Sequence, residues 1–117
     1  MPAATLEERL RHILHAIELI QTHTQGKSLA DYAADPVLQA AVERWLLIVS
    51  EAARFVPEDQ RQTHPEIPWR NVADFGNVLR HAYDHVAPDR VWAVVTDHLP
   101  TLDAAVRAMV DEGGSLP

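Results

Sequence analysis

Residues 36–56 read Pro-Val-Leu-Gln-Ala-Ala-Val-Glu-Arg-Trp-Leu-Leu-Ile-Val-Ser-Glu-Ala-Ala-Arg-Phe-Val. Apolar side chains recur in this stretch at steps of three and four residues, which predicts an amphipathic helix. The pair Asp35-Pro36 supplies an N-cap and a first helical residue, and the proline that follows the stretch ends the helix. Leu46 and Leu47 widen the apolar stripe, so we expect this helix to be buried on two sides.

Another helix precedes this stretch, and a short segment joins the two. Thr5 suits the N-cap of this first helix, and Gly26 closes it. The helix has about five turns, and its apolar stripe comprises Leu6, Leu10, Ile13, Leu14, Ile17 and Ile20. Residues 28–35 predict a short cap or a single turn.

Two further helices are expected downstream. Residues 57–67 are polar and contain proline, which predicts a loop. A third helix starts near Pro68, and its apolar stripe comprises Val72, Phe75, Leu79, Ala82 and Val86. A fourth runs from about Pro88 to Asp111, and we expect Pro100 to kink it or to break it in two.

The pattern as a whole predicts an all-α fold. No segment alternates apolar and polar residues as a strand would, and no internal repeat is present. We therefore expect an antiparallel bundle of four to five helices. It forms a single domain over residues 1–112, and the pair Gly113-Gly114 begins a flexible tail over residues 113–117.

Composition narrows the class of protein. The chain has 117 residues, 47% of them hydrophobic, and no Cys, which excludes a disulfide framework and a thiolate zinc site. A formal net charge of −7 argues against a protein that coats nucleic acid. The negative net charge is compatible with an enzyme that acts on RNA, because such an enzyme needs only a local cationic site. Neither a membrane span nor a signal peptide is apparent, so we expect a cytoplasmic protein.

The third helix carries an unusual density of reactive side chains. On a helical wheel of ~100° per residue, the apolar stripe occupies one side. The other side and its flanks carry Arg70, Asn77, Arg80, His81, Tyr83, Asp84 and His85. A solvated outer face would explain isolated charges, but two arginines, two histidines, an amide and a phenol together favour a functional surface.

This surface allows two chemical interpretations. His81 and His85 stand four residues apart, a spacing found in metal sites, but no third ligand accompanies them, so no metal is expected. His81 suits general acid/base work, and Arg80 and Asn77 suit a phosphate. This set favours RNA cleavage without a metal or other cofactor. One helix offers a single well-placed pair, so we expect a two-fold homodimer whose third helices face each other and share acid and base.

Four segments together resemble the HepT-like branch of the HEPN superfamily. They are Ile67-Pro68-Trp69-Arg70, the run Asn77-Val78-Leu79-Arg80-His81-Ala82-Tyr83-Asp84, Leu29-Ala30-Asp31-Tyr32 and Asp89-Arg90-Val91-Trp92. The resemblance covers nearly the whole chain. It implies a HEPN-like helical homodimer, and many members are ribonuclease toxins of type VII-like modules, each paired with an antitoxin that is an MNT-type nucleotidyltransferase.

The resemblance also implies roles for single residues. The family signature is an Arg, four to six residues, a His, and a Tyr two positions beyond. His81 and Tyr83 match this signature, which makes Tyr83 the acceptor of AMP from the antitoxin. From the chemistry of the side chains, His81 is the expected catalytic residue, with Asn77 and Arg80 at the phosphate. Arg70 and His85 are further candidates for binding phosphate or RNA.

One position departs from the signature. Gly76 stands where the family has its Arg. Arg80 or Arg70 would then have to reach the same phosphate, and the glycine would let two helices approach closely, as at a dimer cleft. The alternative is a weak or inactive nuclease that acts as a binding partner of the nucleotidyltransferase. A third possibility is a helical dimer with neither role.

Overall fold

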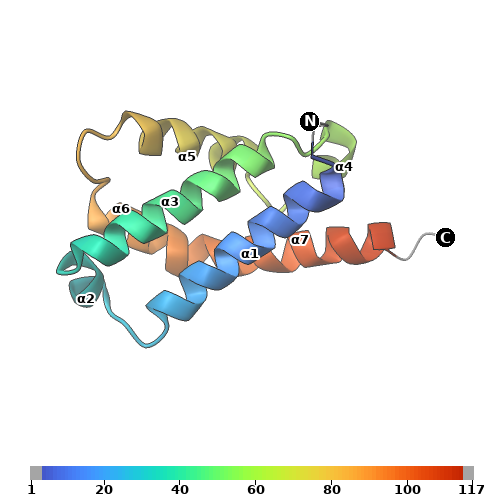
Figure 1. The fold of residues 1–117 in the computed structure, drawn as a ribbon. Helices are drawn as coiled ribbons and strands as arrows, with labels where there is room; N and C mark the ends of the chain where they lie inside the picture. Colours follow the sequence, from blue (N-terminus) through green and yellow to red (C-terminus); the bar gives the residue numbers. More distant parts are fainter. Residues whose placement is uncertain (1–3, 115–117) are drawn as a thin grey trace.

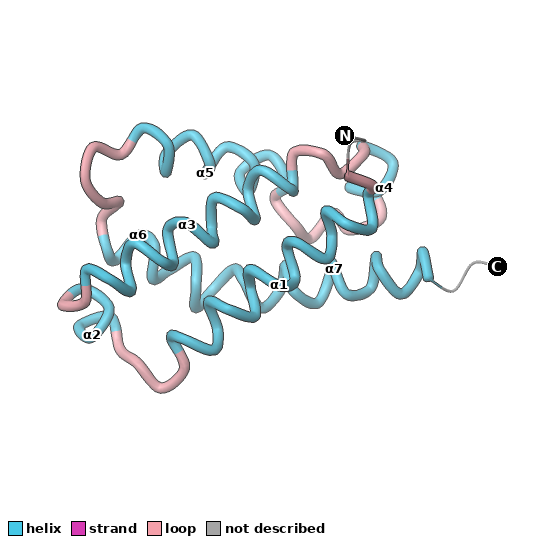
Figure 2. Tube along the Cα trace, in the orientation of Figure 1, coloured by secondary structure: helices cyan, strands magenta, loops and turns pink. Residues whose placement is uncertain are grey.

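The computed structural model describes residues 4–114, and every regular element in that range is a helix. Figure 1 shows the elements in order, and Figure 2 shows the loops between them. They are α1 (Leu6–Thr24), α2 (Leu29–Ala33), α3 (Pro36–Ala53), α4 (Glu58–Gln62), α5 (Trp69–His81), α6 (Pro88–Ala93), a π-helical turn η1 (Val94–His98) and α7 (Leu99–Gly114). The predicted all-α fold is confirmed.

The long helices form an antiparallel bundle with α3 near its middle. In Figure 1, α1, α3, α5 and the continuous run α6–η1–α7 alternate in direction. Helix α3 packs against α1 on one side and α5 on another, while α7 packs against α1. The wide apolar stripe of α3 explains this position. Its buried residues include Leu38, Val42, Leu46 and Val49, as expected for a helix covered on two sides.

Helix starts follow the predicted caps. The Thr5 hydroxyl accepts a hydrogen bond from the Glu8 N–H at 3.1 Å, and the Glu8 carboxylate accepts one from the Thr5 N–H at 3.2 Å. This reciprocal pair satisfies two N–H groups that the first turn leaves free. At α3, the Asp35 carboxylate accepts from the Leu38 N–H at 3.0 Å. Local chemistry thus sets both starts.

The predicted loop at residues 57–67 is partly wrong, because it contains the short helix α4. Helix α3 also ends at Ala53, before the expected proline. Contacts of the Arg61 side chain of α4 explain why α4 lies against the end of α3. Arg61 Nε donates to the Val56 carbonyl at 2.8 Å, and its Nη2 donates to the carbonyls of Ala53 at 3.2 Å and Arg54 at 3.4 Å. Arg61 therefore satisfies carbonyls that the end of α3 leaves without intrahelical partners.

The third predicted helix ends earlier than expected. Helix α5 stops at His81, so the wheel positions assigned to residues 83–86 do not apply. Pro88 disfavours helical backbone at the residue before it. In addition, the Val86 N–H donates to a Glu43 carboxylate oxygen of α3 at 3.5 Å, and the Val86 side chain is buried. These contacts hold residues 82–87 as a connecting loop.

Pro100 lies in the first turn of α7, and the regular α-helix expected from Pro88 to Asp111 is interrupted just before it. The turn η1 precedes it, and the Leu99 N–H donates to the Val94 carbonyl five residues earlier. Proline has no N–H and its ring crowds the preceding turn, and the wider π-helical turn accommodates it. Helix α7 continues to Gly114, two residues into the predicted tail, whose residues 115–117 lie outside the described part. No helix among residues 4–114 is long and apolar enough to cross a membrane.

Candidate functional site

The candidate residues lie at the C-terminal end of α5 and in the loop after it. Trp69 anchors the other end of the helix, because its ring is buried and its Nε1 donates to the His64 carbonyl at 3.1 Å. Gly76 is the other buried residue of α5. With one side of the helix fixed against α3, the last turn exposes Asn77 and His81.

Gly76 marks the close approach of α5 to α3. A Cβ atom at this position would lie 3.1 Å from Ser50 Cβ and 3.3 Å from Arg80 Nη1. The first distance is shorter than most Cβ contacts, so a side chain at this position would require α3 or α5 to shift by a few tenths of an ångström. The sequence led us to expect that Gly76 allows close approach across a dimer, and the helix it approaches here is α3 of the same chain. An arginine at position 76 would need the α3–α5 packing to change.

Arg80 occupies the space beside Gly76. Its guanidinium forms an ion pair with the Glu51 carboxylate of α3 and donates a hydrogen bond to the Asn77 side-chain oxygen. The side chain retains 33% of its exposure. The structure therefore joins two of the predicted site residues, Arg80 and Asn77, and adds a carboxylate that balances the charge of the arginine.

His81 is the last residue of α5 and is exposed. It follows Arg80 directly, so the imidazole and the guanidinium start from neighbouring backbone positions. Arg70 lies in the first turn of the helix, also exposed. Eleven residues separate it from His81, or ~16 Å along the axis at 1.5 Å per residue. Arg70 is therefore not part of the cluster around His81 within one chain.

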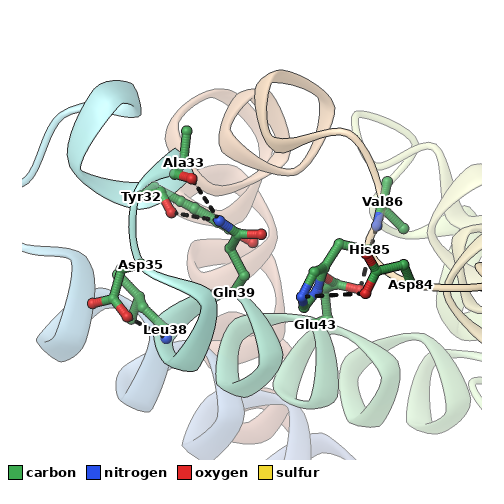
Figure 3. Close-up of polar contacts among 9 residues, drawn as sticks. All are labelled: Tyr32, Ala33, Asp35, Leu38, Gln39, Glu43, Asp84, His85 and Val86. Atoms are coloured by element: carbon green, nitrogen blue, oxygen red, sulfur yellow. Dashed lines mark hydrogen bonds and ion pairs between the residues drawn. The ribbon is translucent and has the colours of Figure 1, made fainter.

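His85 lies in the loop rather than on the helix. Its Nδ1 is 2.8 Å from a carboxylate oxygen of Glu43, and its Nε2 is 3.8 Å from a carboxylate oxygen of Asp84 (Figure 3). The helical spacing of His81 and His85 suggested by the sequence is wrong because α5 ends between them. Within residues 4–114, no three His, Asp or Glu side chains are grouped so that they could hold a metal ion.

The two tyrosines of the chain differ completely in accessibility. Tyr83 is fully exposed in the loop two residues after His81. Tyr32 of α2 is fully buried, and burial raises its pKa, with the Glu43 carboxylate adding to the effect. The Gln39 amide fixes the backbone there by donating to the carbonyls of Tyr32 at 2.9 Å and Ala33 at 3.0 Å (Figure 3).

A separate cavity of about 470 Å³ lies between α3, α5 and the α6–η1–α7 run. Its α5 wall includes Val72, Phe75 and Val78, and neither Asn77, Arg80 nor His81 lines it. The cavity therefore does not coincide with the polar cluster at the end of α5.

Sequence reasoning missed Glu43 and Glu51, the two α3 carboxylates that hold the polar side chains. They lie 42 and 29 residues from their partners, His85 and Arg80. A signal was present in the sequence. Both are charged residues inside a stretch whose apolar pattern predicts burial on two sides, and a carboxylate in such a helix needs a partner.

Comparison with known proteins finds a matching family model and several relatives that are named as ribonucleases. A family model described as ribonuclease HepT-like matches residues 13–109. A protein of Thermococcus cleftensis named "Probable ribonuclease HepT" is 38% identical over 96 residues, covering 82% of this chain and 87% of that protein. A "Putative RNase" of Caldanaerobacter subterraneus subsp. tengcongensis is 31% identical over 103 residues, covering 88% and 92%. No solved structure matches the chain.

Proposed function

This chain belongs to the ribonuclease HepT-like family, and from that membership we propose that it is a metal-independent endoribonuclease. The observation that carries the proposal is the exposed His81 at the end of α5, in the same helical turn as the joined Arg80 and Asn77 side chains. An imidazole can transfer protons near neutral pH, and a guanidinium with an amide can hold a phosphate.

The reaction is attack by the 2′-hydroxyl of RNA on the adjacent phosphorus. The O2′–P bond forms, the P–O5′ bond breaks, and one proton leaves the 2′-oxygen while another reaches the 5′-oxygen. His81 performs one of these proton transfers. Arg80 stabilises the charge that develops on the phosphate oxygens, and the Asn77 amide N–H is available to donate to them, since its oxygen accepts from Arg80. The reaction needs no cofactor.

Arg70 and the dimer extend the site to a longer RNA. Arg70, at the far end of the same helix, binds a neighbouring part of the RNA backbone. In the proposed two-fold homodimer, two α5 helices face each other across a cleft, so a bound strand meets two copies of the site. One α5 ends in one imidazole, so the acid and the base of a site come from different subunits of the dimer.

We further propose that the protein is the toxin of a type VII-like toxin–antitoxin module, silenced by an MNT-type nucleotidyltransferase that adds AMP to Tyr83. The full exposure of Tyr83, two residues from His81, supports this role. A phosphodiester on that phenol would bring negative charge and bulk to the mouth of the site. It would repel RNA and compete for Arg80.

The decisive experiment is cleavage of RNA by the purified protein in the presence of EDTA. We expect cleavage by the wild type and by His12→Ala, in which an exposed histidine of α1 is removed, and loss of cleavage in His81→Ala. Full activity in His81→Ala would remove His81 from the mechanism. Complete loss of wild-type activity in EDTA would overturn the metal-independent reaction.

A second candidate function is a catalytically weak protein that acts by binding the nucleotidyltransferase. The pairing of Arg80 with Glu51, together with Gly76 at the position of the signature arginine, favours it. Expression of the protein alone separates the two functions. Growth arrest that depends on His81 supports the nuclease, whereas normal growth with both wild type and His81→Ala supports the binding role.

A further inference from the structure

The cavity between α3, α5 and the α6–η1–α7 run has no role in the reaction proposed above. Its volume of about 470 Å³ lies within the range of about 300–1,000 Å³ that is typical of ligand sites. Val72, Phe75 and Val78 of α5 line it and are only half-buried, although they belong to the apolar side of the helix. The described residues therefore leave part of this apolar side without a cover.

Polar side chains reach the cavity from α5 and α6. Asn71 and Asp74 of α5 and Arg90 of α6 line it, and all three are exposed. Among the described residues, the side chains of Asn71 and Asp74 form no hydrogen bond or ion pair, and Arg90 has no carboxylate partner. Glu66 also lines the cavity, but its carboxylate contacts His64 Nδ1 at 3.2 Å. Asp74 is therefore the carboxylate that is available to a ligand.

Phe75 turns the face of its ring toward one of these groups. The Arg90 guanidinium lies over the ring, 5.5 Å from its centre. An aromatic face that an exposed cation covers can also be stacked by a planar heterocycle, because both interact with the same π-surface. The cavity thus combines a stacking surface with a carboxylate, a guanidinium and an amide. Proteins bind nucleobases with these groups.

We propose that this cavity binds a guanine base. The base stacks on Phe75, and the Asp74 carboxylate accepts hydrogen bonds from N1–H and from the 2-amino group. The base moves the Arg90 guanidinium aside, and Arg90 or Asn71 then donates to O6. Guanine fits best because its two neighbouring donors match the two oxygens of a carboxylate. Uracil presents carbonyl oxygens on the corresponding edge, and the Asp74 carboxylate repels them.

The rim of the cavity shares a side of α5 with His81. Asp74 and His81 are seven residues apart, so they lie on nearly the same side of the helix, ~10 Å apart along its axis. Both are exposed. A strand with a phosphate at His81 therefore passes Asp74 within about three stacked nucleotides of 3.4 Å. That RNA supplies the base rests on the proposed function, since a free guanine nucleotide shares the same chemistry.

The test is titration of the full chain with guanosine, inosine and uridine, followed by NMR. We expect guanosine to bind most tightly, inosine, which lacks the 2-amino group, at least about 5-fold more weakly, and uridine not measurably. Asp74→Asn keeps the size of the side chain and should weaken guanosine binding about 10-fold or more. Thr101→Trp places a large ring on the cavity wall from an exposed position and should abolish binding.

A matched control removes a carboxylate elsewhere. Asp111→Asn changes an exposed residue of α7 outside the cavity and should leave guanosine binding unchanged. Thermal unfolding checks that each variant is folded. Equal binding of guanosine and uridine, or no loss of affinity in Asp74→Asn, would overturn the assignment. No guanosine binding by the wild type, with a change of oligomeric state in Thr101→Trp, would mean that a protein surface covers the cavity instead.

RNA cleavage identifies the source of the base. Two short RNAs are compared that differ only in carrying guanosine or uridine beside the cleaved bond. A lower KM for the guanosine RNA, lost in Asp74→Asn with kcat unchanged, supports a base of the RNA in the cavity. Equal KM values for RNAs that are cleaved would overturn RNA as the source. Guanosine binding without any RNA cleavage would overturn the proposed nuclease and leave the cavity assignment standing.

Discussion

Arg80 of α5 and Glu51 of α3 are paired beside Gly76, where the two helices approach so closely that a side chain at position 76 would have a tight contact with Ser50. The guanidinium lies 3.3 Å from the point that a Cβ of residue 76 would occupy. A positive group therefore stands next to the backbone position where the family signature has its arginine, and it comes from the following turn of the helix.

The two arginines of α5 should affect RNA cleavage differently. Arg80→Ala removes the guanidinium beside His81, so we expect kcat to fall by about 100-fold. Arg70→Ala removes a charge ~16 Å away along the helix, so KM should rise and become less sensitive to salt while kcat stays the same. Steady-state kinetics at two salt concentrations distinguish them, and equal effects on kcat would contradict the assignment.

Gly76→Leu should destabilise the fold despite a better helix propensity. A leucine gains up to about 1 kcal/mol in the helix interior, but its Cβ would press on Ser50 Cβ at 3.1 Å. Overpacking of this kind costs about 1–3 kcal/mol, so we expect a net loss in urea unfolding. The matched variant Asn71→Leu, at an exposed position of the same helix, should change stability by less than about 0.5 kcal/mol.

The chain contains 2 tyrosines, which makes the predicted AMP site simple to test. After co-expression with the nucleotidyltransferase, intact-mass spectrometry should show added AMP units in the wild type and in Tyr32→Phe, whose phenol is buried. The added mass should disappear in Tyr83→Phe. Persistence of the adduct there would show that another residue is the acceptor, and neutralisation without any adduct would mean inhibition by binding alone.

Tyr32 should limit stability at alkaline pH. Burial raises its pKa above the ordinary value of 10.0, so the folded state keeps the proton where the unfolded chain loses it. The contribution to stability is complete below pH 10.0 and declines as the pH rises through the raised pKa. Thermal unfolding between pH 9 and 11 should show this decline in the wild type, and Tyr32→Phe should reduce it.

The same variant should be well tolerated at neutral pH. The Tyr32 hydroxyl is buried and has no hydrogen-bond partner within residues 4–114. Removing such a group is neutral or stabilises by up to about 1 kcal/mol. A large loss of stability in Tyr32→Phe would mean that the hydroxyl forms a hydrogen bond that stabilises the folded state.

Arg61→Ala should weaken the end of α3. Three carbonyls of residues 53–56 accept from the Arg61 side chain, and a charged donor contributes about 1.5–3 kcal/mol. We expect a loss of about 2 kcal/mol in denaturant unfolding. Arg11→Ala, which removes an exposed pair with Glu7, serves as the control and should cost less than about 0.5 kcal/mol.

Features that depend on neighbouring residues could be predicted from the sequence. The capping box at Thr5 and the Asp35 cap lie within four residues of their partners, and the apolar stripes give the all-α bundle. Helix α4 could also have been found, since Pro57 precedes Glu58 and Asp59, which suit a first turn. The loop prediction gave too much weight to polarity.

Features that depend on distant partners could not be predicted in the same way. Helix α5 ends at His81, and the loop after it is held where the Val86 N–H donates to Glu43, 43 residues away. No local signal at residues 82–85 predicts that contact. The sequence assigned both Asn77 and Arg80 to a phosphate, but the Glu51 partner of Arg80 becomes visible only when α3 and α5 are packed.

The π-helical turn η1 acts as a phase shift within the last long helix. A turn closed five residues apart holds one more residue than an α-helical turn, and each residue rotates the remainder of the helix by ~100°. Leu102, Val106 and Met109 face the core after that rotation. Deleting one residue from Val94–His98 would allow a regular helix but would turn these side chains away from α1. The angular setting of α7 thus depends on the number of residues in the turn.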